Sequence, residues 1–187
     1  LHSLVDEKLS FKNNLMKDYE VLNDIEIYLN KNAMIESAQV YKTVSGILVN
    51  EVKQRTPIGR VFDKGQVYYM DSNGKIMPRS KNHSARVPIV TGEINETTLK
   101  DVNLILSKIH QDEFLKKSIV GIDIFPYRNI ILTDRNFNFK IVFGKAVDID
   151  RKFNNYKAFI QHSLQDTIIK NYKEVNLNFI QQVVCTK

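Results

Sequence analysis

Residues 175–186, just before the terminal Lys187, constrain the fold of this 187-residue chain more than any other segment. They carry no charge and contain no glycine or proline. Val175, Leu177 and Phe179 alternate with polar residues, which predicts a single long β-strand with these three side chains on one face. Exposed sheet edges are usually blunted by lysine, proline or bulges because they invite pairing. We therefore expect a strand that lies inside a sheet or offers an open edge to another chain.

The N-terminal third of the chain predicts a small α+β unit. Apolar residues recur at helical spacing in residues 15–32, which predicts a helix. Residues 38–43 and 47–52 then alternate on either side of Ser45-Gly46, which is typical of a β-hairpin. Because Pro57 closes this pattern, we expect a first domain of residues 1–60.

Residues 61–187 predict a larger sheet with covering helices. Residues 67–70 and 75–77 flank Asn73-Gly74, a strong hairpin signal, and residues 98–109 form an amphipathic helix. Strands are expected at residues 119–125, 129–133 and 137–143, followed by an amphipathic helix at 150–168 and the closing strand. Strands in runs separated by helices favour a mixed or antiparallel sheet covered on one face. The predicted fold class is therefore α+β.

Composition and charge exclude several functional classes. A hydrophobic content of 43% with 26% charged residues is ordinary for a globular domain, and no apolar run reaches the roughly 18–20 residues that span a bilayer. The net charge is +6, but basic residues are interleaved with acids and form no block, so we expect no nucleic-acid binding. The single Cys185 rules out an internal disulfide. Because the chain opens at Leu1 and not at Met, we expect an ectodomain or fragment whose targeting segment has been removed.

No residue pattern predicts a catalytic, metal or cofactor site. Asp148 and Asp150 could share a metal on a strand, but their place before a helix favours capping. Cys185 lacks a neighbouring base, and no glycine-rich phosphate loop or nucleophile elbow is found. The spacing of acids alone leaves glycoside chemistry open. The histidines lie far apart in the sequence, without metal-ligand spacing: His2, His83, His110 and His162.

Five short motifs, in order, resemble the extracytoplasmic region of the FtsQ/DivIB family of bacterial cell-division proteins. Residues 22–40 resemble the helix and "N-P-x-I/V-x-x-A-x-V" strand of its POTRA domain, with Ala33 in place of proline. Residues 54–60 are similar to the "E/Q-R-x-P-x-A" exit from that domain, residues 69–75 to a "Y-x-D-x-x-G" hairpin, and residues 87–92 to "L-P-x-L-x-G". Residues 143–145, with the basic start of the next helix, resemble "L-G-R". The closing strand departs from "V-D-L-R-Y" by having asparagine at both charged positions.

The resemblance implies a POTRA domain followed by a β domain, with no catalytic activity, no cofactor and no small-molecule ligand. It implies a scaffold of the division septum that gathers FtsB-like and FtsL-like partners and through them the septal peptidoglycan synthase. It also implies an inner-membrane parent with one N-terminal transmembrane helix and this region in the periplasm. The expected mode of binding is strand addition to the closing strand. The predicted partner-binding residues are Val175, Leu177, Phe179, Gln181, Lys145 and Arg151.

Two alternatives remain open at the level of sequence. Another POTRA-containing envelope protein, with a peptide-binding or chaperone-like role, would take many extended peptides where a scaffold prefers one partner. A cell-wall enzyme would need titratable groups that converge in a cleft, and the scattered histidines and acids indicate none.

Overall fold

The structure, a computed structural model, describes residues 19–79, 84–163, 167–179 and 181–187 and divides the chain between Arg55 and Thr56 into two compact units. The expected boundary after residue 60 falls within a strand of the second unit, β3 (Pro57–Asp63). Among the helices of the described residues, none combines the length and apolar character needed to cross a membrane.

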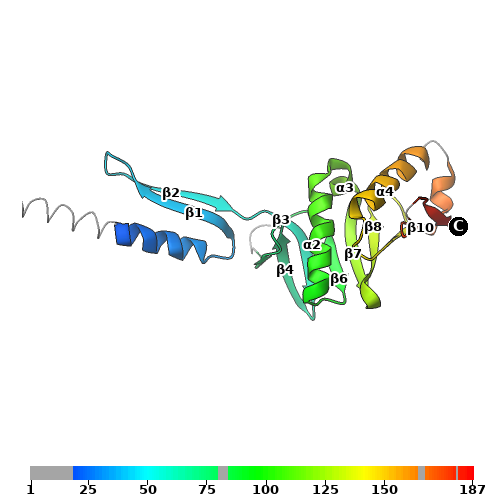
Figure 1. Cartoon of the computed structure of the whole chain (residues 1–187), viewed down its shortest axis with the longest axis horizontal. Coiled ribbons are helices and arrows are strands. Elements are labelled where there is room, and N and C mark those ends of the chain that lie inside the picture. Colours follow the sequence, from blue (N-terminus) through cyan, green and yellow to red (C-terminus); the bar gives the residue numbers. More distant parts are fainter. Residues whose placement is uncertain (1–18, 80–83, 164–166, 180) are drawn as a thin grey trace, which may run out of the picture. The chain divides into compact units, whose positions relative to one another are not determined.

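The first unit consists of a helix beside a two-stranded hairpin (Figure 1). Residues 19–30 are helical, and β1 (Ile35–Lys42) pairs antiparallel with β2 (Leu48–Gln54) around a turn at Gly46. The expected hairpin is thus present; the start of the expected helix, residues 15–18, lies outside the described residues. Ala38 and Val40 are the buried apolar residues that the structure describes in this unit. Its identity as a POTRA domain stays a prediction.

Side chains of the helix cover the outer edge of β1. The Asn30 side-chain amide donates to the Ala38 carbonyl at 3.1 Å and accepts from the Ala38 N–H at 2.8 Å. The Val40 N–H donates to the Glu26 carboxylate at 3.0 Å. Backbone groups that would otherwise be open to a neighbouring strand are therefore bonded within the unit.

The second unit contains a mixed sheet of nine strands in its described part, in the order β11-β10-β9-β8-β7-β6-β3-β4-β5. Three strand pairs are parallel (β3 with β6, β6 with β7, β9 with β10) and the rest are antiparallel, which confirms the predicted α+β class with a mixed sheet. Besides β3, the strands are β4 (Gln66–Asp71), β5 (Ile76–Met77), β6 (Ile89–Gly92), β7 (Ile119–Phe125), β8 (Asn129–Asp134), β9 (Lys140–Gly144), β10 (Glu174–Asn176) and β11 (Val184–Thr186).

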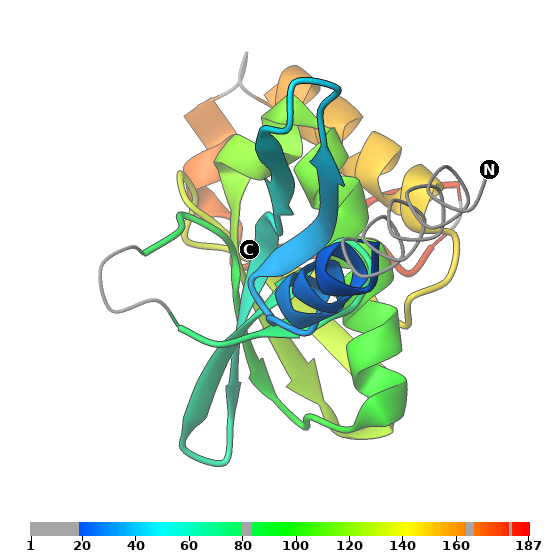
Figure 2. The same ribbon diagram turned by 90° about the vertical axis from the view of Figure 1, so that its left-hand side faces the viewer.

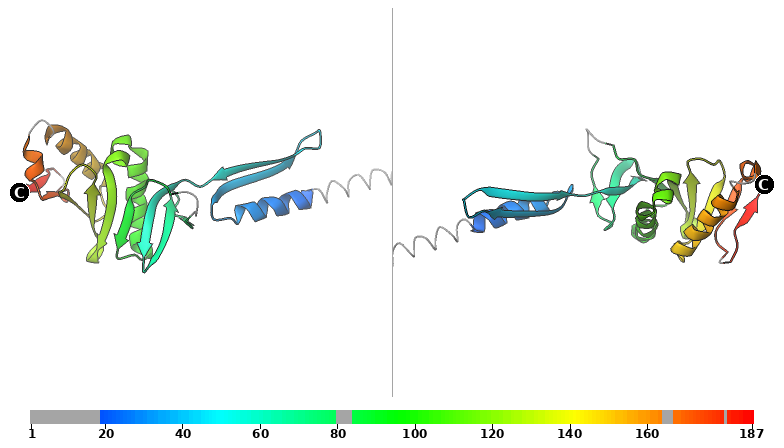
Figure 3. Two further views of the ribbon diagram at one scale, coloured as in Figure 1. Left: turned by 180° about the vertical axis from the view of Figure 1, so that it is seen from behind. Right: turned by 90° about the horizontal axis from the view of Figure 1, so that it is seen from above.

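Helices cover one face of this sheet, as Figures 2 and 3 show from two directions. The longer ones are α2 (Glu96–Gln111) and α4 (Ile149–Ser163); α3 (Glu113–Ser118) and the 3-10 turns η1 (Pro126–Arg128) and η2 (Thr167–Asn171) are short. The Asn95 side chain caps α2 by accepting from the Thr97 and Thr98 N–H groups. Both long helices turn their predicted apolar faces to one core: Val102, Leu106 and Ile109 of α2, and Phe153, Tyr156 and Ile160 of α4. The expected inward Leu164 lies outside the described residues.

The closing segment differs from the single long strand that the sequence predicts. It forms a short hairpin in which β10 pairs parallel with β9, and β11 returns antiparallel along β10. The chain leaves the strand at Asn178, whose N–H donates to the Asn176 side chain at 3.0 Å. This local side-chain bond competes with strand pairing and starts a turn without glycine or proline. The outermost strand at the C-terminal edge is therefore β11.

Candidate partner-binding site

The free edge of β11 exposes the backbone of Cys185. The Leu177 N–H donates to the Val142 carbonyl and the Lys140 N–H to the Lys173 carbonyl, each at 2.9 Å, so the odd-numbered residues of β10 face β9. Glu174 and Asn176 therefore face β11, where they pair with Thr186 and Val184. The N–H and C=O of Cys185 point the other way and have no backbone partner among the described residues.

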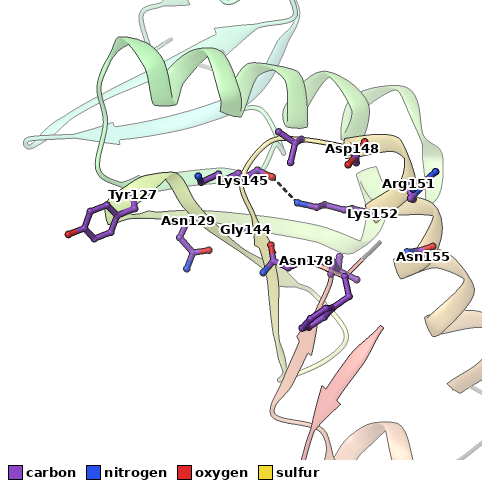
Figure 4. A pocket seen from close by; sticks show the side chains of 12 residues that line it. Tyr127, Asn129, Gly144, Lys145, Asp148, Arg151, Lys152, Asn155 and Asn178 are labelled. Atoms are coloured by element: carbon purple, nitrogen blue, oxygen red, sulfur yellow. Dashed lines mark hydrogen bonds between the residues drawn. The ribbon is translucent and has the colours of Figure 1, made fainter. Parts of the chain in front are cut away.

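A pocket of about 470 Å³ lies at the end of the sheet where β9 stops and α4 begins (Figure 4). Because β10 runs parallel to β9 and β11 returns along it, the turn between β10 and β11 is at this same end. Four of the six predicted site residues line the pocket, namely Lys145, Arg151, Leu177 and Phe179. The other lining residues are Tyr127, Asn129, Gly144, Val147, Asp148, Lys152, Asn155 and Asn178.

The predicted residues of the closing segment divide into core and surface. Val175 is 0% exposed and Leu177 1%, and both belong to the central apolar cluster, so their side chains hold β10 against the helices. Their predicted role as partner contacts does not fit this burial. Phe179 is 47% exposed, and Gln181 is exposed beyond the pocket. Phe179 is therefore the predicted residue that combines a large apolar side chain with access to a partner.

Gly144 lets the Asn178 side chain of the closing segment approach the end of β9. It has a φ of +70°, and a Cβ at this position would overlap the Asn178 side-chain amide. Only glycine adopts this conformation readily and leaves that space empty. The Gly144–Asn178 contact thus fixes where the chain turns away from β10, and with it the position of Phe179 on the next residue.

Lys152 forms the floor of the pocket and is a residue that the sequence analysis missed. It is 6% exposed, and its Nζ donates to the Phe143 carbonyl at 2.7 Å and the Lys145 carbonyl at 2.8 Å. Burial lowers the pKa of this ammonium, which the nearby Asp148 partly opposes. The ammonium also lies 4.8 Å from the centre of the Phe143 ring. The sequence signal for the burial of Lys152 was its position beside Phe153, on the inward face of α4.

The charge of the pocket favours an anionic guest. Lys145 and Arg151 are exposed cations at its rim, Lys152 is a cation at its floor, and Asp148 is the one carboxylate among the lining residues. Several asparagine side chains supply further donors and acceptors. An acidic side chain or a terminal carboxylate on a peptide would fit this arrangement.

The turn between β7 and β8 forms the other rim of the pocket in an unusual conformation. Tyr127 (φ 62°, ψ 25°) and Arg128 (φ 60°) are both left-handed, and the Asn129 N–H donates to the Pro126 carbonyl. This is the type I′ pattern, which asparagine and glycine normally occupy. Left-handed geometry costs about 1–2 kcal/mol for each ordinary residue.

A bidentate ion pair holds this strained turn in place. The Arg128 guanidinium donates two hydrogen bonds of 2.6 Å each to the carboxylate of Asp101, a buried residue of α2. The same carboxylate raises the pKa of Arg128. Tyr127 itself is 91% exposed, and Figure 4 shows its ring directed out of the pocket. Sequence reasoning predicted a turn here but not its handedness.

Comparisons with known proteins give a family match and a similar solved structure. The sequence profile of the family described as "FtsQ/DivIB, C-terminal related" matches residues 56–186. A similar solved structure is the major extracytoplasmic domain of the trans isomer of the bacterial cell division protein DivIB from Geobacillus stearothermophilus. The two share 14% sequence identity with a TM-score of 0.42, and the match covers 62% of this chain and 98% of that one. No curated protein sequence gives a significant match.

The family match confirms the resemblance inferred from the short motifs. It spans the described sheet and helices of the second unit and includes the pocket and both strands of the closing hairpin. Because the match extends over more than half of the sequence, the chain belongs to the FtsQ/DivIB C-terminal related family of cell-division proteins.

Proposed function

We propose that this chain is a non-catalytic scaffold of the bacterial division septum that binds an FtsB-like partner by strand addition to β11. Through that partner it gathers an FtsL-like protein and the septal peptidoglycan synthase. The parent protein is anchored in the inner membrane and presents this region to the periplasm. Family membership supports a role in cell division. The free backbone edge of β11 and the side chains of Lys145, Arg151 and Phe179 support the mode of binding.

The observation that carries the proposal is the free edge of β11 beside a cationic pocket. The outward backbone groups of Cys185 can pair with an incoming strand, and strand addition obtains its affinity from such main-chain bonds. Lys145 and Arg151 line the pocket at the end of the sheet where β11 begins, and they suit acidic residues of the same partner. Phe179 supplies an aromatic anchor, with Gln181 exposed in the same turn.

The polar residues near this site do not favour an enzyme. Among the described residues, no three histidine, cysteine, aspartate or glutamate side chains converge as metal ligands would. Burial raises the pKa of the Cys185 thiol, which disfavours the reactive thiolate. The Lys152 ammonium is engaged by two carbonyls. These features suit a binding surface.

Proline substitution at Cys185 tests the edge directly. Deleting the whole closing segment would remove Val175 and Leu177 from the core, whereas Cys185→Pro removes the outward N–H and leaves the bonds of Val184 and Thr186 to β10. The matched control, Cys185→Ala, removes the side chain but keeps the N–H. Each variant is titrated calorimetrically with a peptide from the periplasmic end of the cognate FtsB-like protein, after circular dichroism confirms folding.

The proposal expects saturable one-to-one binding of the wild-type chain, near-unchanged binding of Cys185→Ala, and at least tenfold weaker binding of Cys185→Pro. Equal binding by the alanine and proline variants would exclude pairing at β11. Comparable binding of unrelated extended peptides would favour the other candidate, a chaperone-like envelope protein. Absence of wild-type binding would contradict the partner assignment itself.

A further inference from the structure

We propose that Tyr127 is a second aromatic anchor for the partner, at the rim of the pocket formed by the β7–β8 turn. This inference rests on the proposed function, because its ligand is the same FtsB-like segment. It adds a contact outside the closing hairpin, since η1 is separated from β11 in the sheet by β8, β9 and β10. The bound segment would then extend across the pocket from β11 to the β7–β8 turn.

The conformation of Tyr127 is the first observation behind this inference. A left-handed first position in a type I′ turn suits asparagine or glycine, yet a bulky aromatic residue occupies it here. The ring is 91% exposed and is absent from the apolar cluster, so packing against this chain does not account for it. Backbone strain of this kind clusters at functional sites.

The rigidity of the turn is the second observation. The Arg128–Asp101 ion pair ties the turn to a buried carboxylate of α2, and the Asn129–Pro126 backbone bond closes it. Asp101 is itself buried, so the anchor point is part of the packed core. A tyrosine on so constrained a backbone has a fixed Cα–Cβ direction, so little backbone entropy is lost when a partner covers the ring.

The composition of the pocket identifies the occupant as an acidic peptide segment with apolar residues. The same pocket is lined by the cations Lys145, Arg151 and Lys152 and by two exposed aromatic residues, Phe179 on the closing hairpin and Tyr127 on the β7–β8 turn. An acidic side chain of the partner suits these cations, and apolar side chains of the same segment suit the two rings.

A pair of turn variants separates binding from stability. Tyr127→Asn should relieve the left-handed strain and raise the melting temperature by about 2–4 °C, while weakening binding of the FtsB-like peptide about tenfold or more. The matched control is Lys64→Asn in the β3–β4 turn, where Lys64 (φ 45°) precedes Gly65 in the same kind of turn. It should raise the melting temperature similarly and leave binding unchanged. Tyr127→Phe should bind nearly as the wild type, because it keeps the ring.

The outcomes distinguish this inference from the proposed function. If the wild-type chain binds, and Cys185→Pro does not, but Tyr127→Asn binds like the wild type, then Tyr127 is not an anchor and strand addition stands. If Tyr127→Asn lowers both melting temperature and affinity, the side chain is structural and the inference fails. If the wild-type chain does not bind the peptide, the result contradicts both the proposed function and the role of Tyr127.

Discussion

Phe179 owes its exposure to two neighbouring residues. The Asn178 N–H is bonded to the Asn176 side chain, and Asn178 itself fills the space that Gly144 leaves open. These contacts turn the backbone at residue 178, so the next side chain leaves the core that Val175 and Leu177 enter. A strict two-residue alternation would have placed all three on one buried face. The change of direction leaves Phe179, a predicted strand residue, exposed at the surface.

Replacement of Phe179 therefore affects binding more than stability. We expect Phe179→Ala to lower the free energy of unfolding by less than about 1 kcal/mol, because the ring is about half exposed. Loss of an aromatic anchor should weaken binding of the FtsB-like peptide by about 2 kcal/mol or more, roughly thirtyfold. Urea unfolding and calorimetric titration measure the two effects.

Phe62→Ala is the matched control, since Phe62 has similar exposure on β3, away from the closing hairpin. It should leave the affinity unchanged. A Phe179 variant that loses stability but retains affinity would show that the ring belongs to the core.

At the scale of elements, Asp112 links α3 to α4. Its carboxylate caps α3 by accepting from the Phe114 and Leu115 N–H groups at 3.0 Å each, and it accepts from the Lys157 ammonium of α4 at 2.7 Å. The hydrogen bond from Lys157 is the main cause that lowers the pKa of Asp112 below its ordinary value of 3.8. The junction between α2 and α3 is thereby fastened to the helix that closes the pocket.

This link predicts a pH-dependent difference between the wild type and Asp112→Asn. Asparagine caps a helix as well as aspartate does, so the substitution removes mainly the ion pair. We expect the variant to be less stable at pH 7 by under about 1 kcal/mol. A lowered folded-state pKa gives stability that is present above 3.8 and lost as the pH falls through the folded value.

Urea unfolding at pH 7, 5, 3 and 2 checks the sign of this effect. The difference between the two proteins should persist at pH 5 and shrink below pH 3.8. Lys157→Met should be less stable than the wild type by a similar amount and with the same pH dependence, because it removes the other partner of the ion pair. A gap that stays constant down to pH 2 would show that the carboxylate charge is not responsible.

Elements with complete local patterns could be predicted from the sequence. The expected strands at residues 119–125 and 129–133 correspond to β7 and β8, and the helix expected at 98–109 is the central part of α2. The family resemblance came from motifs that lie largely at such elements and their turns, and the profile match confirms it.

Features that depend on tertiary contacts could not be predicted. The turn after Leu177 contains no glycine or proline. Its Asn178 side chain needs the space beside Gly144, which lies 34 residues earlier in the sequence. The pocket is lined by residues from η1, the β9–α4 connection and the closing hairpin. No local sequence pattern predicts that these three segments lie close together. The left-handed turn at Tyr127 is stabilised by Asp101 on another element, so its sequence resembles an ordinary turn.

At the scale of the whole molecule, the two units differ greatly in the apolar core that they bury. Ala38 and Val40 are the buried apolar residues described in the first unit, whereas the central cluster of the second unit joins all its long elements. Stability follows the amount of buried apolar surface, so the units should differ in resistance to unfolding.

We therefore expect the first unit to open before the second. Backbone amides of β1 and β2 should exchange with solvent much faster than those of β7 and β8, and urea unfolding should show two transitions. A shortened chain of residues 56–187 should keep the later transition and its affinity for the FtsB-like peptide, because every proposed contact lies within it. Coincident transitions, or loss of binding on shortening, would contradict this independence.

The three residues of β11 limit how long a partner strand can remain bound. So short an edge offers few backbone hydrogen bonds, each with a net value of about 0.5–1.5 kcal/mol. Differences in affinity within one interface arise mostly from dissociation rates, so the lifetime of the complex depends on the side chains beyond the strand. In the proposed complex, backbone pairing sets the register of the partner, and aromatic and charged contacts set its residence time. Under the proposed function, such a connection can be released and remade within each round of septum assembly.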